Sequence, residues 1–362
     1  MTDATLRRGW TTGACATAAA RAAFAALNGA GFPDPVEIAL PGGARPSFAL
    51  ATSERGPGFA RAGVVKDAGD DPDVTHGALV LATVRPAPAG SGILFRAGEG
   101  VGTVTRPGLA LPPGEPAINP VPRGMIRAAI ADEALRLGVS PDAEVEIAIP
   151  GGALIAERTL NGRLGIVGGL SILGTTGIVV PYSCAAWIDT IHRGVDVARA
   201  LKLGHVAGAT GNTSEVAVRA LYGLDEPALI DMGDFVGGML KYLRRHPVDR
   251  ITVAGGVAKM TKLAQGLLDL HSKRGEIDRG WLAERARGAG AGDALAAAVL
   301  TCNTAAEAFD LAEGDGVDLG SAVAEAARRT AAACLGRAAG LDVVLFDRTG
   351  RLVARAGSGD RG

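Results

Sequence analysis

The sequence predicts an α/β fold with two domains: an N-terminal α+β domain with a mixed sheet, and a C-terminal Rossmann-like α/β domain with a mostly parallel sheet. Three observations support this prediction. The chain has 362 residues, more than one hydrophobic core usually supports. Residues 60–105 read as β structure. After about residue 160, strand-like and helix-like segments alternate, which is typical of βα units around a parallel sheet.

The N-terminal domain is expected to span residues 1–155. An Ala-rich segment predicts a helix over 14–27. Residues 36–40 and 145–149 both run into Pro-Gly-Gly, which predicts a duplicated strand-turn within one sheet, or else two unrelated strands with a common ending. The remaining predicted elements are strands at 79–84 and 92–97, a Pro- and Gly-rich connection over 106–123 and a helix at 125–137.

The C-terminal domain is expected to span residues 156–362, with a boundary near 150–165. Its predicted strands are 164–167, 205–209, 228–232, 250–253 and 343–346. Its predicted helices are 183–201, 213–222, 234–245, 257–270, 292–312 and 319–338.

Composition excludes several classes of protein. The formal net charge of −1 provides no overall field to attract nucleic acid or an anionic membrane. No run approaches the ~20 apolar residues that span a bilayer. The four cysteines are far apart in the sequence, which argues against a disulfide framework or a structural zinc site. A cytoplasmic location fits best, and self-association is left open.

Three successive turns after predicted strands of the C-terminal domain combine glycines with small polar residues. Ligands of open α/β sheets bind beyond the carboxyl ends of the strands, where helix N-termini donate N–H groups. None of these turns contains a P-loop or a GxGxxG fingerprint. An adenosine ligand bound in another way remains one interpretation of the turns. A purely steric role for the glycines is the other. The candidate cofactor-binding residues are Gly211, Asn212, Thr213, Glu215, Asp231, Asp234, Gly255, Gly256 and Lys259.

A loop over residues 64–77 carries four carboxylates, a lysine, a threonine and a histidine. The same segment contains the turn-forming residues Gly69, Pro72 and Gly77. Charged groups rarely line a core, because burying unpaired charge is costly, whereas catalytic groups often lie on loops. Asp67, Asp70 and His76 are the candidate proton acceptors or orienting groups. A solvated acidic turn is the alternative.

Taken together, these segments resemble the cobalt-precorrin-5B C(1)-methyltransferase family of corrin-ring synthesis. The similarity is carried in order by 6–16, 65–75, 98–102, 114–123, 173–178, 211–215, 255–262 and 271–273. Trp10, Ala14 and the Val180-Pro181-Tyr182 turn depart from the usual family pattern.

The resemblance implies methyl transfer from S-adenosylmethionine to ring carbon C1 of cobalt-precorrin-5B, giving cobalt-precorrin-6A in cobalamin biosynthesis. It implies a tetrapyrrole substrate that carries the cobalt, with no metal bound by the protein itself. From the turns we infer that the tetrapyrrole contacts a separate set of residues: Thr11, Thr12, Gly13, Lys66, Thr175, Thr176, His271 and Lys273.

Two other functions remain open from the sequence. A small-molecule kinase-like phosphoryl transferase would use the Gly- and Thr-rich turns for ATP and the acidic loop for Mg²⁺. A non-catalytic tetrapyrrole-binding protein would bind the macrocycle without consuming S-adenosylmethionine.

Overall fold

The computed structural model describes residues 6–357 and divides into two compact units, Met1–Ser183 and Cys184–Gly362. The division falls later than the sequence suggested, since residues 156–183 complete the first unit. Within them, β10 (Ile166–Val167) pairs with β8 (Thr103–Val104), and β11 (Ile178–Val179) pairs with β1 (Gly9–Trp10).

The N-terminal unit is built on a five-stranded mixed sheet in the order β4-β5-β6-β9-β7. Only β7 and β9 are parallel, and the other neighbours are antiparallel. Buried residues alternate with less buried ones along β9, the pattern of a sheet with one face in the core. The strands are β4 Thr52–Gly56, β5 Phe59–Val65, β6 Leu79–Pro86, β7 Ile93–Ala97 and β9 Ala143–Ala148.

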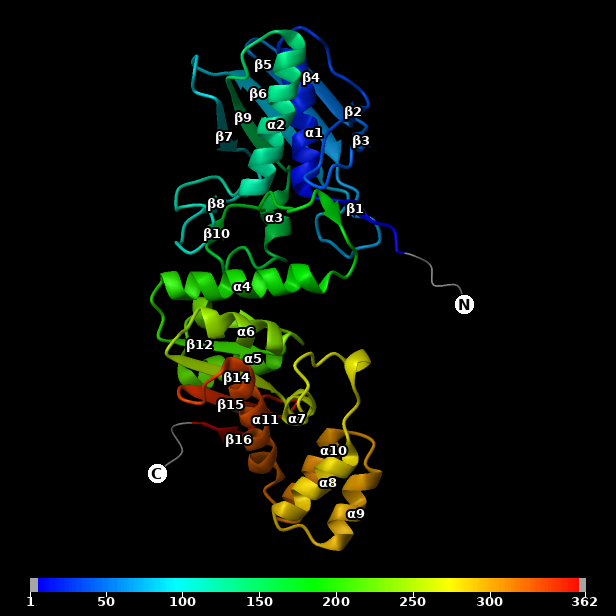
Figure 1. Ribbon diagram of the computed structural model, residues 1–362, viewed down its shortest axis with the longest axis vertical. Helices are drawn as coiled ribbons and strands as arrows, with labels where there is room; N and C mark the ends of the chain where they lie inside the picture. The colour runs from blue at the N-terminus through cyan, green and yellow to red at the C-terminus, as the bar shows by residue number, and fades with distance from the viewer. Residues whose placement is uncertain (1–5, 358–362) are drawn as a thin grey trace. The chain divides into compact units, whose positions relative to one another are not determined.

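Two helices, α1 (Thr12–Leu27) and α2 (Pro120–Leu137), lie side by side against this sheet (Figure 1). Almost every residue of α1 is buried, because its alanines let the helix approach both α2 and strands β5 and β6 closely. The Thr11 side chain caps α1 by accepting a hydrogen bond from the Ala14 amide at 3.2 Å. The predicted helices over 14–27 and 125–137 therefore exist, each beginning a few residues earlier.

The two segments that end in Pro-Gly-Gly lie in different sheets, so the prediction of one shared sheet was wrong. β2 (Val36–Glu37) pairs with β3 (Ser47–Phe48) in a small sheet of its own, because the turn after Leu40 reverses the chain at once: the Leu40 amide donates to the Ala44 carbonyl at 2.9 Å. The second segment, β9, leads instead into the short helix α3 (Gly152–Ala156).

The C-terminal unit contains the second five-stranded sheet, in the order β13-β12-β14-β15-β16. The first four strands are parallel, and β16 is antiparallel to β15. The strands predicted near 205, 228, 250 and 343 are therefore present and pair with one another. Their bounds are β12 His205–Ala209, β13 Leu229–Asp231, β14 Arg250–Gly256, β15 Leu341–Phe346 and β16 Leu352–Ala356.

Helices cover both faces of this sheet. Val218 of α5 packs with the residues of one strand face, while buried residues of α6, α7 and α11 pack on the opposite face. The chain order changes direction between β12 and β14, and a crevice forms at such a point beyond the carboxyl ends of the strands. The helices are α4 Cys184–Ala200, α5 Asn212–Tyr222, α6 Val236–Arg245, α7 Val257–Ala264 and α11 Leu319–Leu335, with short 3₁₀ turns at Glu226–Ala228 and Ser272–Arg274.

Between α7 and α11 the chain forms three further helices, shown in yellow and orange in Figure 1. α8 (Arg279–Gly288) was not predicted, and the single helix predicted over 292–312 is two helices, α9 (Asp293–Thr301) and α10 (Ala305–Gly314). The break has a local cause. The Glu307 amide donates to Thr304 Oγ1 at 3.2 Å while the Glu307 carboxylate accepts from the Asn303 amide at 2.8 Å, which closely resembles a capping box.

We expect Thr304→Ala to destabilise the C-terminal unit by about 1 kcal/mol, because it removes the acceptor that satisfies an amide at the start of α10. Urea unfolding followed by circular dichroism measures this loss. Thr301→Ala is the matched control, since the exposed Thr301 hydroxyl only donates to carbonyls of its own helix, Ala297 and Ala298. Equal stability losses for both variants would contradict the capping role.

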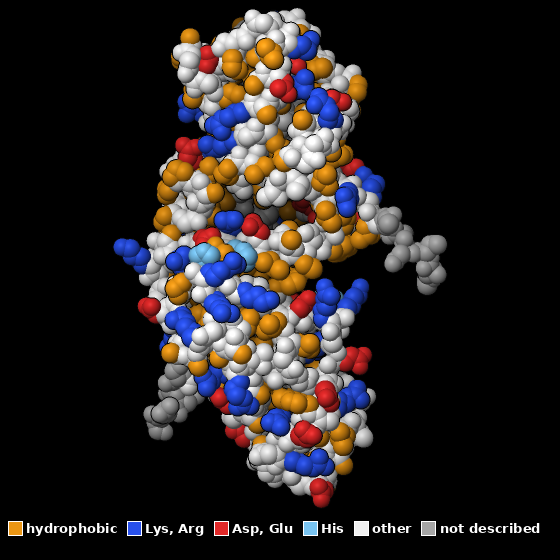
Figure 2. Space-filling view, in the orientation of Figure 1, with side chains coloured by type: hydrophobic (Ala, Val, Ile, Leu, Met, Phe, Trp, Pro, Cys, Tyr) orange, Lys and Arg blue, Asp and Glu red, His pale blue; other side chains and the backbone are white. Residues whose placement is uncertain are grey.

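The visible face of the C-terminal unit carries many Lys and Arg side chains over α4 and α6 (Figure 2). Exposed members of this basic surface include Lys241, Arg244 and Arg245 at the end of α6, where cations also suit the helix dipole. Within residues 6–357, no helix combines the length and the apolar character needed to cross a bilayer.

Candidate functional site

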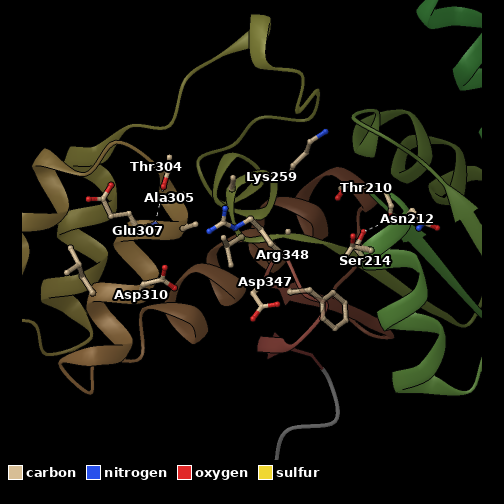
Figure 3. Close-up of a pocket in the computed structure, with 18 residues that line it drawn as sticks. Thr210, Asn212, Ser214, Lys259, Thr304, Ala305, Glu307, Asp310, Asp347 and Arg348 are labelled. Atoms are coloured by element: carbon tan, nitrogen blue, oxygen red, sulfur yellow. Dashed lines mark hydrogen bonds between the residues drawn. The ribbon is translucent and has the colours of Figure 1, made fainter.

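A cavity of about 710 Å³ lies in the C-terminal unit at the point where the strand order reverses. The turn after β12 and the turn after β14 form part of its lining, and α10 and the segment after β15 form the rest (Figure 3). Its volume is within the range of small-molecule sites. The residues that line it are Thr210–Ser214, Gly256–Lys259, Thr304–Glu307, Asp310, Leu311 and Phe346–Arg348.

Two helices begin at this cavity without a side-chain cap. Gly211 precedes α5 and Gly256 precedes α7, and neither residue has a side chain that can accept from the first amides. The first amides of a helix have no acceptor within the helix itself. These N-termini therefore present backbone donors to a ligand, together with the positive ends of two helix dipoles.

Most charged side chains of the cavity already have partners. Lys259 forms an ion pair with Asp234. The Asp347 carboxylate accepts from the backbone and hydroxyl of Thr349 and from Arg351, and these contacts hold the pKa of Asp347 well below its usual range. The carboxylate of Glu307 is used in capping α10.

Two charged side chains in the lining differ from these. Among the described residues, the side chains of Arg348 and Asp310 make no hydrogen bond or ion pair, and both residues are exposed. Arg348 follows β15, and Asp310 lies on α10. The cavity thus contains one cation and one anion that remain available to a ligand.

The cavity brings together part of the expected cofactor site. Gly211, Asn212, Thr213, Gly256 and Lys259 line it. The other four candidates are near it in sequence but do not line it: Glu215 is buried in the first turn of α5, Asp231 ends β13, Asp234 pairs with Lys259, and Gly255 lies within β14 next to the Thr210 side chain.

Sequence reasoning missed the contributions of α10 and of the turn after β15. The Thr304-Ala305-Ala306-Glu307 pattern is a readable helix-start signal. Nothing in the sequence indicated that α10 would fold back beside α7, a contact seen only in the tertiary structure.

In the N-terminal unit, three distant segments form one compact group, which we call the N-terminal loop cluster: residues 7–13, 66–77 and 173–182. The Trp10 amide donates to the Asp67 carbonyl at 2.7 Å, and the Thr11 amide donates to the Gly177 carbonyl at 3.0 Å. The Tyr182 amide donates to the Asp71 carboxylate at 2.8 Å. The acidic loop and the Thr- and Gly-rich turns noticed in the sequence are therefore neighbours.

Two glycines allow the backbone segments of this cluster to pack closely against each other. A Cβ atom added at Gly9 would lie 2.0 Å from the Ala68 carbonyl carbon. Gly69 has φ +69°, and a Cβ atom there would lie 2.2 Å from the Arg7 carbonyl oxygen. Only glycine permits two backbones to approach this closely.

The three candidate catalytic residues all lie in this cluster. Asp67 forms an ion pair with Arg7, with 2.9 Å between Arg7 Nη2 and Asp67 Oδ1. The hydrogen bond from Arg7 and that from the Gly69 amide lower the pKa of Asp67 to about 2, which makes this carboxylate a weak base at neutral pH. Asp70 accepts from the Arg7 amide at 2.6 Å, and His76 Nδ1 accepts from the Ala68 amide at 3.1 Å.

Lys66 is buried and forms contacts within the acidic loop. Its side chain is 2% exposed, and its ammonium donates to the Asp73 carboxylate and the Thr75 hydroxyl. Burial raises the pKa of Asp73, but the charge and hydrogen bond of Lys66 outweigh it, so the net pKa is lowered. The pair fixes the two ends of the acidic loop, since a buried charge must be matched.

The expected substrate-binding residues are divided between the two units. Thr11, Thr12 and Gly13 begin α1 and bind the 173–177 turn, where the Gly13 amide donates to the Leu173 carbonyl at 3.0 Å. Thr175 and Thr176 are exposed on that turn. His271 and Lys273 lie in the C-terminal unit, where His271 Nδ1 accepts from the Lys273 amide at 3.2 Å.

Across residues 6–357, no three His, Cys, Asp or Glu side chains are grouped in a way that could hold a metal ion. Burial raises the pKa of the Cys15 thiol to about 12, so this cysteine is not a thiolate nucleophile at neutral pH.

Comparison with known proteins gives consistent matches along the chain. The family model described as CbiD matches residues 1–181, and the model described as CbiD, C-terminal domain, matches residues 269–357. A protein of Bradyrhizobium sp. (strain BTAi1) named cobalt-precorrin-5B C(1)-methyltransferase is 66% identical over 351 residues, covering 97% of this chain and 93% of the relative. A protein of the same name from Agrobacterium fabrum is 64% identical, and the match covers 98% of this chain and 94% of the relative's length.

Among solved structures, the chain matches a crystal structure of cobalamin biosynthesis protein (cbiD) from Archaeoglobus fulgidus. The two are 28% identical in sequence, and the match covers 74% of this chain and 83% of that chain with a TM-score of 0.40.

Proposed function

The chain belongs to the CbiD family, and we propose that it transfers a methyl group from S-adenosylmethionine to ring carbon C1 of cobalt-precorrin-5B in cobalamin biosynthesis. The observation that carries this proposal is the near full-length identity with relatives named for that reaction, 66% over 97% of the chain for the Bradyrhizobium protein. Agreement over almost the whole length includes both the cavity and the N-terminal loop cluster.

The cavity of the C-terminal unit suits S-adenosylmethionine. This ligand has a net charge of +1 at neutral pH, from a sulfonium, an ammonium and a carboxylate. Two cations, Lys259 and Arg348, line the cavity with three carboxylates, Glu307, Asp310 and Asp347, giving a lining charge of 2 − 3 = −1. The uncapped amides at Asn212 and Val257 provide donors for ribose oxygens or adenine ring nitrogens.

The surrounding fold supports the same assignment. We propose that this unit has a Rossmann-like fold. It has four parallel strands with helices on both faces, and its cavity lies where the strand order reverses. The first unit then serves as the tetrapyrrole-binding domain. Four free cysteines in the described part of the chain fit a reducing cytoplasmic compartment.

We assign the tetrapyrrole to the N-terminal loop cluster. Since His76 Nδ1 accepts a backbone hydrogen bond, the neutral ring carries its proton on Nε2, which can donate to an acetate or propionate group of the macrocycle. Thr175 offers an exposed hydroxyl for the same groups, whereas the Thr176 hydroxyl donates to the Ile178 carbonyl and shapes the turn. Asp67 positions Arg7, and Lys66 maintains the loop.

The bound methyl donor supplies an electrophilic methyl group, so the protein needs mainly to align the two reactants. Alignment alone can remove roughly 7–11 kcal/mol from the barrier of a bimolecular step. None of the protein's side chains is required to form a covalent intermediate.

The direct test is to incubate the protein with S-adenosylmethionine carrying a ¹³C-labelled methyl group and with cobalt-precorrin-5B. We expect one labelled methyl per macrocycle, located at C1 by NMR, with one S-adenosylhomocysteine formed for each product molecule. Binding of the tetrapyrrole without loss of S-adenosylmethionine would identify a carrier protein instead, and would refute the proposal.

A further inference from the structure

We propose that Arg348 and Asp310 together bind the amino-acid end of the methyl donor, Arg348 holding its carboxylate and Asp310 its ammonium group. This inference rests on the proposed function and goes beyond it, because it fixes which part of the cavity takes which end of the ligand. It also assigns roles to two residues that lie outside every motif recognised in the sequence.

The Arg348 guanidinium and the Asp310 carboxylate are both available to a ligand. Among the described residues that line the cavity, Lys259 pairs with Asp234, and the Asp347 and Glu307 carboxylates have intramolecular donors. Arg348 and Asp310 have no such partner, although each lies on the same cavity. No ion pair joins these two side chains in the described part of the chain.

Arg351, on the same turn as Arg348, differs from it because its guanidinium is fully engaged by carboxylates. Arg351 comes three residues after Arg348 and is bound on one side by Glu313, at 2.9 and 3.0 Å, and on the other by Asp347, at 2.9 Å. These contacts brace the turn after β15. Arg348 on the same turn is therefore held in place at its backbone while its guanidinium stays free for a ligand.

An amino-acid group carries a carboxylate and an ammonium on the same carbon, and it is recognised by one cation and one anion placed apart. A guanidinium binds a carboxylate through two parallel hydrogen bonds, and an aspartate accepts from an ammonium. Figure 3 shows Arg348 within the cavity lining, with Asp310 and α10 on one side and the turn after β12 on the other.

This placement orients the rest of the ligand. With its amino-acid end at Arg348 and α10, the adenosine end faces the turns at Thr210–Ser214 and Gly256–Val257. Those turns have the uncapped amides and the small side chains that allow a flat ring to approach the backbone.

The test compares three probes by calorimetry on the full chain. S-adenosylhomocysteine has both charged groups, its decarboxylated analogue keeps only the ammonium, and 5′-methylthioadenosine lacks both. For Arg348→Ala we expect the Kd of S-adenosylhomocysteine to rise roughly tenfold to a hundredfold, as loss of a charge-assisted contact implies, with the Kd of the other two probes unchanged.

For Asp310→Asn we expect weaker binding of both probes that carry the ammonium, by about tenfold, and unchanged binding of 5′-methylthioadenosine. Arg245→Ala, an exposed arginine at the end of α6 outside the cavity lining, is the matched control and should bind all three probes as the unaltered protein does.

The outcomes separate this inference from the proposed function. If the unaltered protein binds S-adenosylhomocysteine and Arg348→Ala binds it equally well, the assignment of Arg348 is overturned while the function stands. Equal losses for all three probes would also overturn it, because they would indicate a change of cavity shape. Failure of the unaltered protein to bind any probe would refute the methyl-donor site, and this assignment with it.

Discussion

Gly9→Ala is expected to unfold the N-terminal loop cluster and to abolish methyl transfer. The added methyl group would lie 2.0 Å from a backbone carbon of Ala68 and 2.4 Å from its oxygen, and backbone cannot rotate away as a side chain can. Overpacking of this kind costs about 3 kcal/mol. Misplacing bound groups by about 1 Å reduces rates on the order of a hundredfold, so activity should fall at least that far.

The matched control is Gly124→Ala, in the same unit. Gly124 lies inside α2, and a Cβ atom there meets nothing within 4 Å, so alanine should stabilise the protein by about 0.5–1 kcal/mol. Urea unfolding and the methyl-transfer rate measure both variants. Normal activity in Gly9→Ala would show that the close approach of residues 9 and 68 is not needed for the site.

Gly211→Leu is expected to abolish binding of the methyl donor while leaving the protein folded. Gly211 lines the cavity at the start of α5, and a Cβ atom there has open space around it. Its backbone is extended, with φ 165° and ψ 173°, so other residues can adopt it. The leucine side chain would project into space that the ligand needs, and we expect the Kd for S-adenosylhomocysteine to rise at least about a hundredfold.

The control for this change is Gly288→Leu, at the exposed end of α8, where a Cβ atom also meets nothing within 4 Å. Both variants should unfold within about 1 kcal/mol of the unaltered protein, and only Gly211→Leu should lose the ligand in calorimetry. Unimpaired binding by Gly211→Leu would mean that the ligand does not approach the turn after β12.

The strands of the C-terminal unit were predictable because each is a short apolar run between turn residues. The run His205–Ala209 was located at its observed bounds, and its neighbours to within a few residues. Buried parallel strands leave this signature, since both faces are covered by helices. Strand order is set by packing of the helices and had to come from the structure.

Helix breaks were harder to predict. Residues 292–312 are rich in alanine and leucine, and composition alone favours one helix. The Thr304 cap and the Glu307 carboxylate instead start a new helix, because satisfying amides at a helix start competes with propensity. This break puts Thr304 and Asp310 on the cavity, so missing it meant missing a third of the lining.

The other features that the sequence did not predict depend on contacts between residues far apart in the chain. From the sequence, residues of 11–13, 66 and 175–176 were assigned to one substrate site, but the backbone hydrogen bonds from Trp10 to Asp67 and from Thr11 to Gly177 that join these segments were not predicted. Glycine at positions 9 and 69 was the available signal, and it reads as a turn until the second backbone is known. The domain boundary was placed too early for the same reason, since β11 returns to pair with β1.

Both proposals for the C-terminal unit require that the methyl donor binds in its cavity. A crystal structure of the protein soaked with S-adenosylhomocysteine would locate the ligand. We expect the adenosine to lie against the amides of Asn212 and Val257 and the carboxylate to lie within hydrogen-bond distance of Arg348. Well-ordered ligand bound anywhere else, with this cavity filled only by solvent, would contradict this expectation.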